Sequence, residues 1–332
     1  MRQVDEFFHT PGEERYWSES HYFDATDEDG NIALHGRVGL YPNRSQANVF
    51  FYLITEDTVY WVRDETIPPE RMHGLVVRDD EWTLAMEPLD PGQEWRVTFE
   101  GTVTETPADD PGAVLAGRGD ESTLSAGFTV ESRHDPFYYS DGETFPDREQ
   151  FDRYEVATRV DGTATIDGRR TPFSGVGERD HSWGRRRWAG DAEWLWVSGA
   201  FEDGTAYNHN TFWLTDHPDG RMINGFWFDG ETRHALTDAT VSETPAFGPE
   251  TTRAWMNGES VPDITMELTW NEGTTTIEVD PAVTTPLDWV NRDRDQRAVL
   301  NRATTTQRRD GAVSGVGFLE NNCQLQLDPG RE

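Results

Sequence analysis

Residues 175–188, GVGERDHSWGRRRW, concentrate more chemistry than any other stretch of the chain. An acid, an imidazole, an indole and several arginines stand among glycines, which suit a backbone with tight clearances. Successive side chains of a strand point to opposite faces, so Arg179, His181 and Trp183 share one face while Asp180 lies on the other. Either face could line a cavity, and the sequence alone leaves both registers open.

The rest of the chain has the pattern of an all-β protein. Asp-Gly pairs, which favour tight hairpin turns, recur along it, for example at Asp29 and Asp229. Between them apolar and polar residues alternate as in half-buried strands, as around Trp95, Val97 and Phe99. No comparable pattern supports a long helix, so the sequence predicts antiparallel β-structure.

Length and an internal repeat indicate two domains. The chain has 332 residues, whereas a domain commonly has about 150. The tetrad SGVG occurs at residues 174–177 and again at 314–317. A strand meander of this size removes its edges by closing, which predicts two tandem antiparallel β-barrels. We expect the N-terminal barrel over residues 1–172 and the C-terminal barrel over 173–332, beginning with the GVGERDHSWG strand.

The charge balance excludes some partners. The chain has 62 acidic and 29 basic residues, a formal net charge of -33, and all of the basic residues are arginine. Such a chain repels phosphates, so no nucleic-acid partner is expected. Acids spread along the whole chain, with arginine in place of lysine, are typical of proteins from halophilic archaea, where molar salt screens self-repulsion. The charge therefore indicates a habitat of high salt and does not indicate a binding partner.

Little suggests export or a membrane. Cys323 is the only cysteine, which excludes an internal disulfide and a multi-cysteine zinc site. The longest apolar run, residues 49–54, is far too short to span a bilayer. The first residues lack an apolar segment and a cleavage site. The sequence predicts a soluble, cytoplasmic protein without a membrane span and leaves its oligomeric state open.

The central motif, GVGERDHSWG followed by Arg and Trp, resembles the signature of the lipocalin-like AttH and carotenoid 1,2-hydratase superfamily, which includes hydroxyneurosporene synthase and relatives of fungal Diels-Alderases. The YWSESHYF segment near the start and the GVGFLE strand near the end agree with it. The resemblance implies two consecutive lipocalin-like barrels and chemistry without a cofactor or a metal.

The resemblance also assigns candidate catalytic residues. In the hydratases the His and Trp of an H-x-W motif act with the Tyr and Asp of a later Y-x-D motif. His181 and Trp183 match the first motif, and Tyr207 matches the tyrosine of the second, but His209 stands where the acid is expected. Either Asp180 supplies the acid, or the reaction differs, or the pocket only binds.

Such a site would protonate a carbon-carbon double bond and let water capture the cation. A carboxyl with a pKa raised by burial is the usual acid, and Asp180 is the candidate, with His181 as its orienter or as the base for water. Aromatic rings stabilise a nearby cation. We therefore assign Asp180, His181, Trp183, Tyr207 and His209 as candidate catalytic residues. The candidate ligand-binding residues are Arg179, Trp188, Trp194 and Trp196.

Three functions remain open on these grounds. The protein binds a hydrophobic small molecule, isoprenoid or lipid-like, and hydrates, isomerises or cyclises it; or it is a carrier or sensor for that molecule; or its barrels are filled and it is structural. An enzyme needs Asp180 or His181 in the cavity, whereas a carrier needs only an apolar lining. A metal held by His181, His209 and Asp180 is a further alternative.

Overall fold

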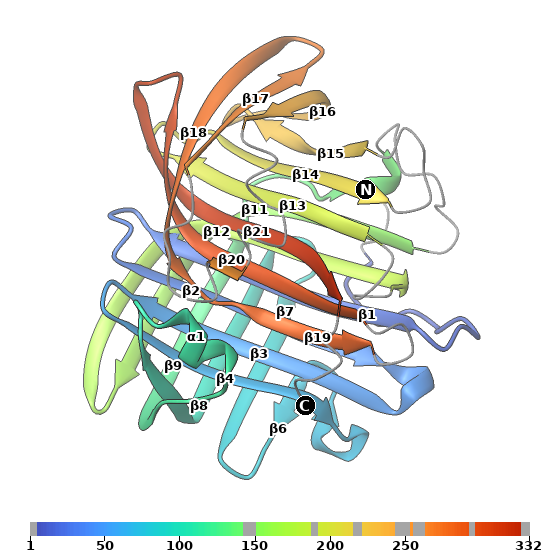
Figure 1. Ribbon diagram of the computed structural model, residues 1–332, viewed down its shortest axis with the longest axis vertical. Coiled ribbons are helices and arrows are strands. Elements are labelled where there is room, and N and C mark those ends of the chain that lie inside the picture. Colours follow the sequence, from blue (N-terminus) through green and yellow to red (C-terminus); the bar gives the residue numbers. More distant parts are fainter. Residues whose placement is uncertain are drawn as a thin grey trace. The chain divides into compact units, whose positions relative to one another are not determined.

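The computed structural model describes residues 5–141, 151–186, 192–214, 221–242, 253–254, 263–291 and 296–326, and these are almost entirely strand, which confirms the all-β prediction. Contacts divide the chain into two units. Unit 1 comprises Met1–Pro107 and Gly119–Arg186, and unit 2 comprises Ala108–Arg118 and Arg187–Glu332. Figure 1 shows the strands of both units along the colour gradient of the chain.

Unit 1 is a closed antiparallel barrel with short additions. Its strands are β1 (Trp17–Asp27), β2 (Ile32–Tyr41), β3 (Gln46–Thr55), β4 (Thr58–Ile67), β5 (Met72–His73), β6 (Val76–Arg78), β7 (Trp82–Asp90), β8 (Glu94–Pro107), β9 (Asp120–Ser132), β10 (Phe137–Tyr138), β11 (Phe151–Ile166) and β12 (Arg169–Arg185). The barrel runs β1-β2-β3-β4-β8-β9-β11-β12 and closes where β12 pairs with β1. Its interior is packed with apolar side chains, among them Phe23, Phe51 and Val97.

Unit 2 closes in the same way. It contains the short helix α1 (Pro111–Leu115) and the strands β13 (Ala192–Phe201), β14 (Ala206–Leu214), β15 (Arg221–Phe228), β16 (Arg233–Val241), β17 (Ile264–Trp270), β18 (Gly273–Thr284), β19 (Leu287–Asn291), β20 (Gln296–Arg309) and β21 (Val313–Gln326). These strands follow one another from β13 to β18, and the ring closes through β20 and β21 back to β13. Two tandem barrels, as the sequence predicts, are therefore present.

The SGVG repeat has the same structural role in both units. Each copy lies on the strand that follows an Asp-Gly turn with left-handed backbone, at Asp167-Gly168 before β12 and at Asp310-Gly311 before β21. A Cβ on Gly177 would collide with the carbonyl oxygen of Asp24 on β1, and one on Gly317 would collide with that of Ser198 on β13. The glycines thus permit the close strand contact through which each barrel closes.

The expected division at residues 172 and 173 differs from the arrangement of the strands. β12 pairs along its length with β11 and β1, so the GVGERDHSWG strand completes unit 1. The physical reason is the turn at Asp167-Gly168, which makes β11 and β12 the two arms of one hairpin. Contacts also assign residues 108–118 to unit 2, although they lie between two strands of unit 1.

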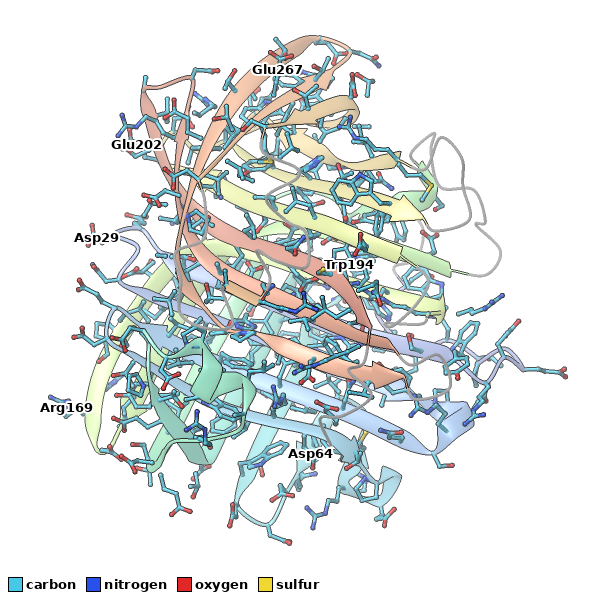
Figure 2. The ribbon with its side chains drawn as sticks, viewed as in Figure 1. Asp29, Asp64, Arg169, Trp194, Glu202 and Glu267 are labelled. Carbon is cyan, nitrogen blue, oxygen red and sulfur yellow. The ribbon has the colours of Figure 1, made fainter. Side chains whose placement is uncertain are left out.

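Many acidic side chains lie at turns and on outward positions of the strands, although several, among them Glu19 and Glu155, are buried. Asp29, Glu202 and Glu267, labelled in Figure 2, are exposed examples, whereas the labelled Trp194 is buried. Among the described residues, no helix has the length and apolar character needed to cross a membrane.

Candidate functional site

The register of β12 decides which side chains of the central motif face the interior of unit 1. His181 lies opposite His21 of β1, and Arg179 lies opposite Phe23, which belongs to the apolar core. Side chains alternate along a strand, so Arg179, His181 and Trp183 face inward while Asp180 faces away from the core. Of the two registers left open by the sequence, the structure has the one with the histidine inside.

Asp180 lies in a buried network of charges on the outer face of the barrel. The Nη2 of Arg153 donates to its Oδ2 at 2.8 Å, and the Nε of the same arginine lies 2.6 Å from Oε1 of Glu155. Burial raises the pKa of the Glu155 carboxyl although Arg153 opposes the shift. The surroundings of Asp180 are thus those of an ion-pair partner, separated by the strand from the interior histidine.

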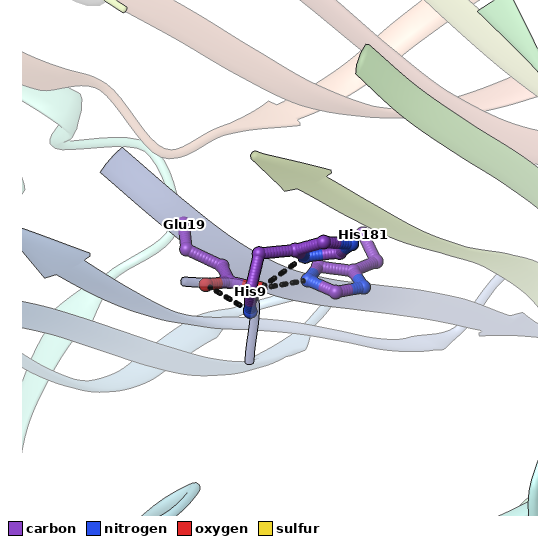
Figure 3. A group of neighbouring side chains, drawn as sticks. All are labelled: His9, Glu19 and His181. Atoms are coloured by element: carbon purple, nitrogen blue, oxygen red, sulfur yellow. Dashed lines mark hydrogen bonds and ion pairs between the residues drawn. The ribbon is translucent and has the colours of Figure 1, made fainter. Parts of the chain in front are cut away.

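His181 is fixed inside the barrel by a bond at each ring nitrogen. Its Nδ1–H donates to the backbone carbonyl oxygen of Asp5 at 2.5 Å, and its Nε2 lies 3.0 Å from Oε1 of Glu19 on β1. Nδ1 carries a proton because its partner is a carbonyl oxygen, and Nε2 is the ring nitrogen that faces the carboxylate. Figure 3 shows the carboxylate of Glu19 joined by dashed lines to the imidazoles of both His181 and His9.

His9 binds the same carboxylate. Its backbone N–H donates to both oxygens of Glu19 at 3.0 and 3.1 Å, and its Nδ1 lies 2.9 Å from Oε1. Burial alone would raise the pKa of Glu19, but hydrogen bonds from His181 and His9 outweigh it and the pKa is lowered. Burial likewise opposes the net rise in the pKa of His9, which Glu19 causes. Trp183 stacks on His9 with ring centroids 4.3 Å apart.

His21 is the one interior imidazole of this cluster without a hydrogen bond to another described residue. It is buried and stacks on His181 with centroids 3.8 Å apart. Burial, followed by the charges of His181 and Arg179, holds its pKa well below the ordinary value, so the ring is neutral. Beside it is a cavity of about 10 Å³, enough for roughly one water molecule. The lining consists of His21, Tyr22, Phe23, Met86, Trp95, Val97, Val130 and Arg179.

Arg179 is a buried cation held by an acid from outside the barrel strands. Its Nη1 and Nη2 donate to the two oxygens of Glu6, each at 3.2 Å, and Nη1 also donates to the hydroxyl of Tyr154 at 2.5 Å. The Tyr154 hydroxyl donates to Oε1 of Glu6 at 3.0 Å. The guanidinium lies 5.0 Å from the ring centroid of Trp95. Residues 5–9, which supply Glu6 and His9, are thus held by side chains that face the interior of the barrel.

The remaining predicted site residues belong to unit 2. Tyr207 is buried and donates to Oε1 of Gln307 at 2.9 Å. His209 hydrogen-bonds the Thr211 hydroxyl at 3.0 Å, and burial, with a smaller effect of Arg221, lowers its pKa to about 3. Trp194 donates to Glu320 at 2.7 Å, and Trp196 is buried as well. Trp188 lies outside the described residues.

The alternative metal set of His181, His209 and Asp180 is not formed on one surface, because Asp180 and His181 lie on opposite faces of β12. In the described part of the chain, His9, Glu19 and His181 have ligand atoms within 4.8 Å of one another. Two imidazoles and a carboxylate suit zinc or non-haem iron, and Nδ1 of His181 bonds a carbonyl as in many metal sites. These three residues could hold a metal, but direct hydrogen bonds already account for their geometry.

Sequence reasoning missed the partners of His181. Glu19 and His21 lie two residues apart in the YWSESHYF segment, so a strand there places both on one face, which is the signal that could have found them. Glu6 and His9 had no such signal. They lie in a stretch without regular structure, and only the contacts of the fold bring them to β12.

The fold has well-matched relatives among solved structures, all at low sequence identity. A crystal structure described as an AttH protein from Nitrosomonas europaea has a TM-score of 0.60 and 14% identity, covering 97% of this chain and 96% of that one. CghA has a TM-score of 0.56 and 12% identity, covering 99% and 96%. Kievitone hydratase from Nectria haematococca has a TM-score of 0.55 and 12% identity, covering 96% of each chain.

These likenesses confirm, at the level of fold, the resemblance read from the central motif. No curated protein matches the sequence. A family model described as a domain of unknown function, DUF7064, matches residues 2–324, nearly the full length. The chain therefore belongs to the DUF7064 family and has the two-barrel, lipocalin-like fold of the AttH and hydratase proteins.

Proposed function

We propose that unit 1 binds a hydrophobic small molecule, isoprenoid or lipid-like, and hydrates, isomerises or cyclises it by acid-base chemistry. The observation that carries this proposal is the stacked pair of His21 and His181. One ring is bonded to Glu19, while the other is neutral, without a hydrogen-bond partner among the described residues, and borders an interior cavity. An acid and a base are thereby placed side by side in a largely apolar chamber.

The proposed chemistry follows from the positions of the two imidazoles. A proton on Nε2 of His181, where this nitrogen faces Glu19, would pass to one carbon of a double bond, leaving a cation on the other carbon. The faces of Trp95 and Trp183 would stabilise that cation, each by roughly 1–2 kcal/mol when water is excluded. For hydration, a water molecule would attack the cation and give a proton to His21, which restores charge balance. Loss of a different proton to His21 would instead give an isomer.

The solved relatives support this class of function. One is named a hydratase, and CghA has also been solved with the compound Sch210972. Asp180 has a smaller part in the proposal than the sequence suggests, because Arg153 holds it on the outer face. Tyr207 and His209 remain candidates that belong to unit 2.

Native mass spectrometry with extraction of bound lipid tests the proposal on protein purified from its own host in high salt. Wild type and His181→Ala are compared, with His73→Ala, an exposed histidine on β5, as the control. A compound held by wild type, and a different, unconverted compound held by His181→Ala, would support an enzyme. Absence of any bound compound from all three proteins, including after incubation with a host lipid extract, would contradict the proposal.

A carrier is the second candidate, and one observation favours it. His181 and Arg179 are each bonded to residues 5–9, and the cavity beside them is small. Such a barrel, with little free volume beside the bonded residues 5–9, is what we expect of a carrier without its ligand. The same compound held by wild type and His181→Ala would indicate a carrier.

A further inference from the structure

Residues 5–9 contact the barrel in an unusual way, because an acidic side chain is buried and two aromatic side chains are exposed. The carboxylate of Glu6 is 1% exposed, whereas the neighbouring Phe7 and Phe8 are 64% and 42% exposed. Segments normally bury aromatic rings and leave carboxylates in water. Burial of Phe7 and Phe8 therefore contributes little, and polar contacts attach this stretch to the interior: Glu6 with Arg179, the Asp5 carbonyl with His181, and His9 with Glu19.

The barrel needs an anion at this position. Arg179 is 3% exposed, and a buried guanidinium without a counter-charge is strongly unfavourable. Glu6 meets both of its terminal nitrogens and also accepts from Tyr154. The site is thus built for one planar carboxylate, bound bidentately by arginine and from the side by a phenol. Any ligand that displaces residues 5–9 has to replace that charge.

We propose that the ligand of unit 1 is an amphipathic carboxylic acid whose carboxylate takes the place of Glu6 on Arg179 and Tyr154. This inference rests on the proposed function and names its substrate class. The apolar body of the acid would enter the interior past the edge of His21, where the cavity lined by Met86, Val97 and Val130 has room for about one water molecule and these side chains would have to move apart. Such a ligand supplies the charge that Glu6 supplies and adds the apolar burial that Phe7 and Phe8 do not.

The geometry favours a singly charged carboxylate over other head groups. An alcohol or ester would leave Arg179 without a counter-charge. A phosphate would bring a second negative charge into an interior that already contains Glu19, in a chain with a net charge of -33. Glu6 itself shows that a carboxylate fits between the guanidinium and the phenol.

Fluorescence titration with parinaric acid, a polyene fatty acid, and with its methyl ester tests the proposal on the full chain in 1 M KCl. The variants are Glu6→Gln, Arg179→Gln and Tyr154→Phe, with Glu13→Gln, an exposed acid, as the control for Glu6. We expect the acid to bind wild type at least about tenfold more tightly than the ester. Glu6→Gln removes the competing carboxylate, so the acid should bind about tenfold more tightly still, while Glu13→Gln changes nothing.

Arg179→Gln should reduce binding of the acid to the level of the ester. Tyr154→Phe, which keeps the ring, should weaken binding of the acid severalfold and leave binding of the ester unchanged. This variant tests the proposal if circular dichroism shows that Arg179→Gln does not fold. Equal binding of acid and ester to wild type and Glu6→Gln would overturn the carboxylate anchor while leaving the proposed function in place. No binding of either probe to any variant would count against both.

Discussion

One buried imidazole sets part of the response of unit 2 to acid. His209 is fully buried and its pKa is lowered to about 3, first by burial and then by Arg221. Between about pH 6.5 and 3 the unfolded chain binds a proton there that the folded chain does not, so stability falls as the pH falls.

We therefore expect wild type to lose about 2 kcal/mol from this residue between pH 8 and pH 5. In His209→Gln, which cannot titrate, that part of the loss should be absent. Urea unfolding followed at both pH values measures it, with the exposed His73→Gln as the control. An identical pH dependence in wild type and His209→Gln would contradict the lowered pKa, because it would mean that the folded protein takes up the His209 proton as readily as the unfolded chain.

A second prediction concerns the side chain of Asp180. If its task is to pair with Arg153, Asp180→Ala should lower the stability of unit 1 by roughly 3 kcal/mol, because a buried cation loses a partner. Binding of the interior ligand should then be nearly unchanged. The matched control is Asp161→Ala, an exposed acid on β11. If Asp180 were instead a general acid, Asp180→Ala would lose turnover at unchanged stability. Thermal unfolding and ligand titration together distinguish the two outcomes.

At the scale of the element, the close packing of β12 on β1 and of β21 on β13 explains the GVG repeat. Gly177 faces the backbone of β1 so closely that a methyl group has no room, whereas a Cβ on Gly127 of β9 would meet only Thr98 at 4.0 Å. We expect Gly177→Ala to destabilise unit 1 by several kcal/mol, in the range of severe core substitutions, and Gly127→Ala to have little effect. Circular dichroism during thermal unfolding measures both. Equal melting curves for the two variants would contradict the packing role of Gly177.

The same two strands show what sequence can predict. Asp-Gly turns and alternation are local signals, so the all-β class, the two barrels and the hairpins at Asp167 and Asp310 follow from them. The assignment of β12 to a barrel does not, because its pairing with β1 joins residues 17 and 185. For the site, His181 and Trp183 were identifiable by motif and Glu19 by spacing. Glu6 depends entirely on tertiary contacts.

At the scale of the whole molecule, charge is the dominant property. With a net charge of -33, self-repulsion destabilises the folded chain and salt screens it. We expect the unfolding midpoint to rise steeply between about 0.05 and 1 M KCl, over which the Debye length falls from more than 10 Å to about 3 Å, and more slowly above that. A midpoint that stays constant or falls over this range would argue against adaptation to salt.

Barrel closure has a consequence for how the protein is made. The first strand of unit 1 has its partner on β12, so the ring is incomplete until residue 185 has left the ribosome. Pairings between such distant residues form late and slowly, because a long loop must be ordered first. Residues 5–9 can settle only after that, since Arg179 and His181 lie on β12. The stacking of His9 on Trp183 should therefore appear in the last phase of refolding of unit 1, as a late change in tryptophan fluorescence.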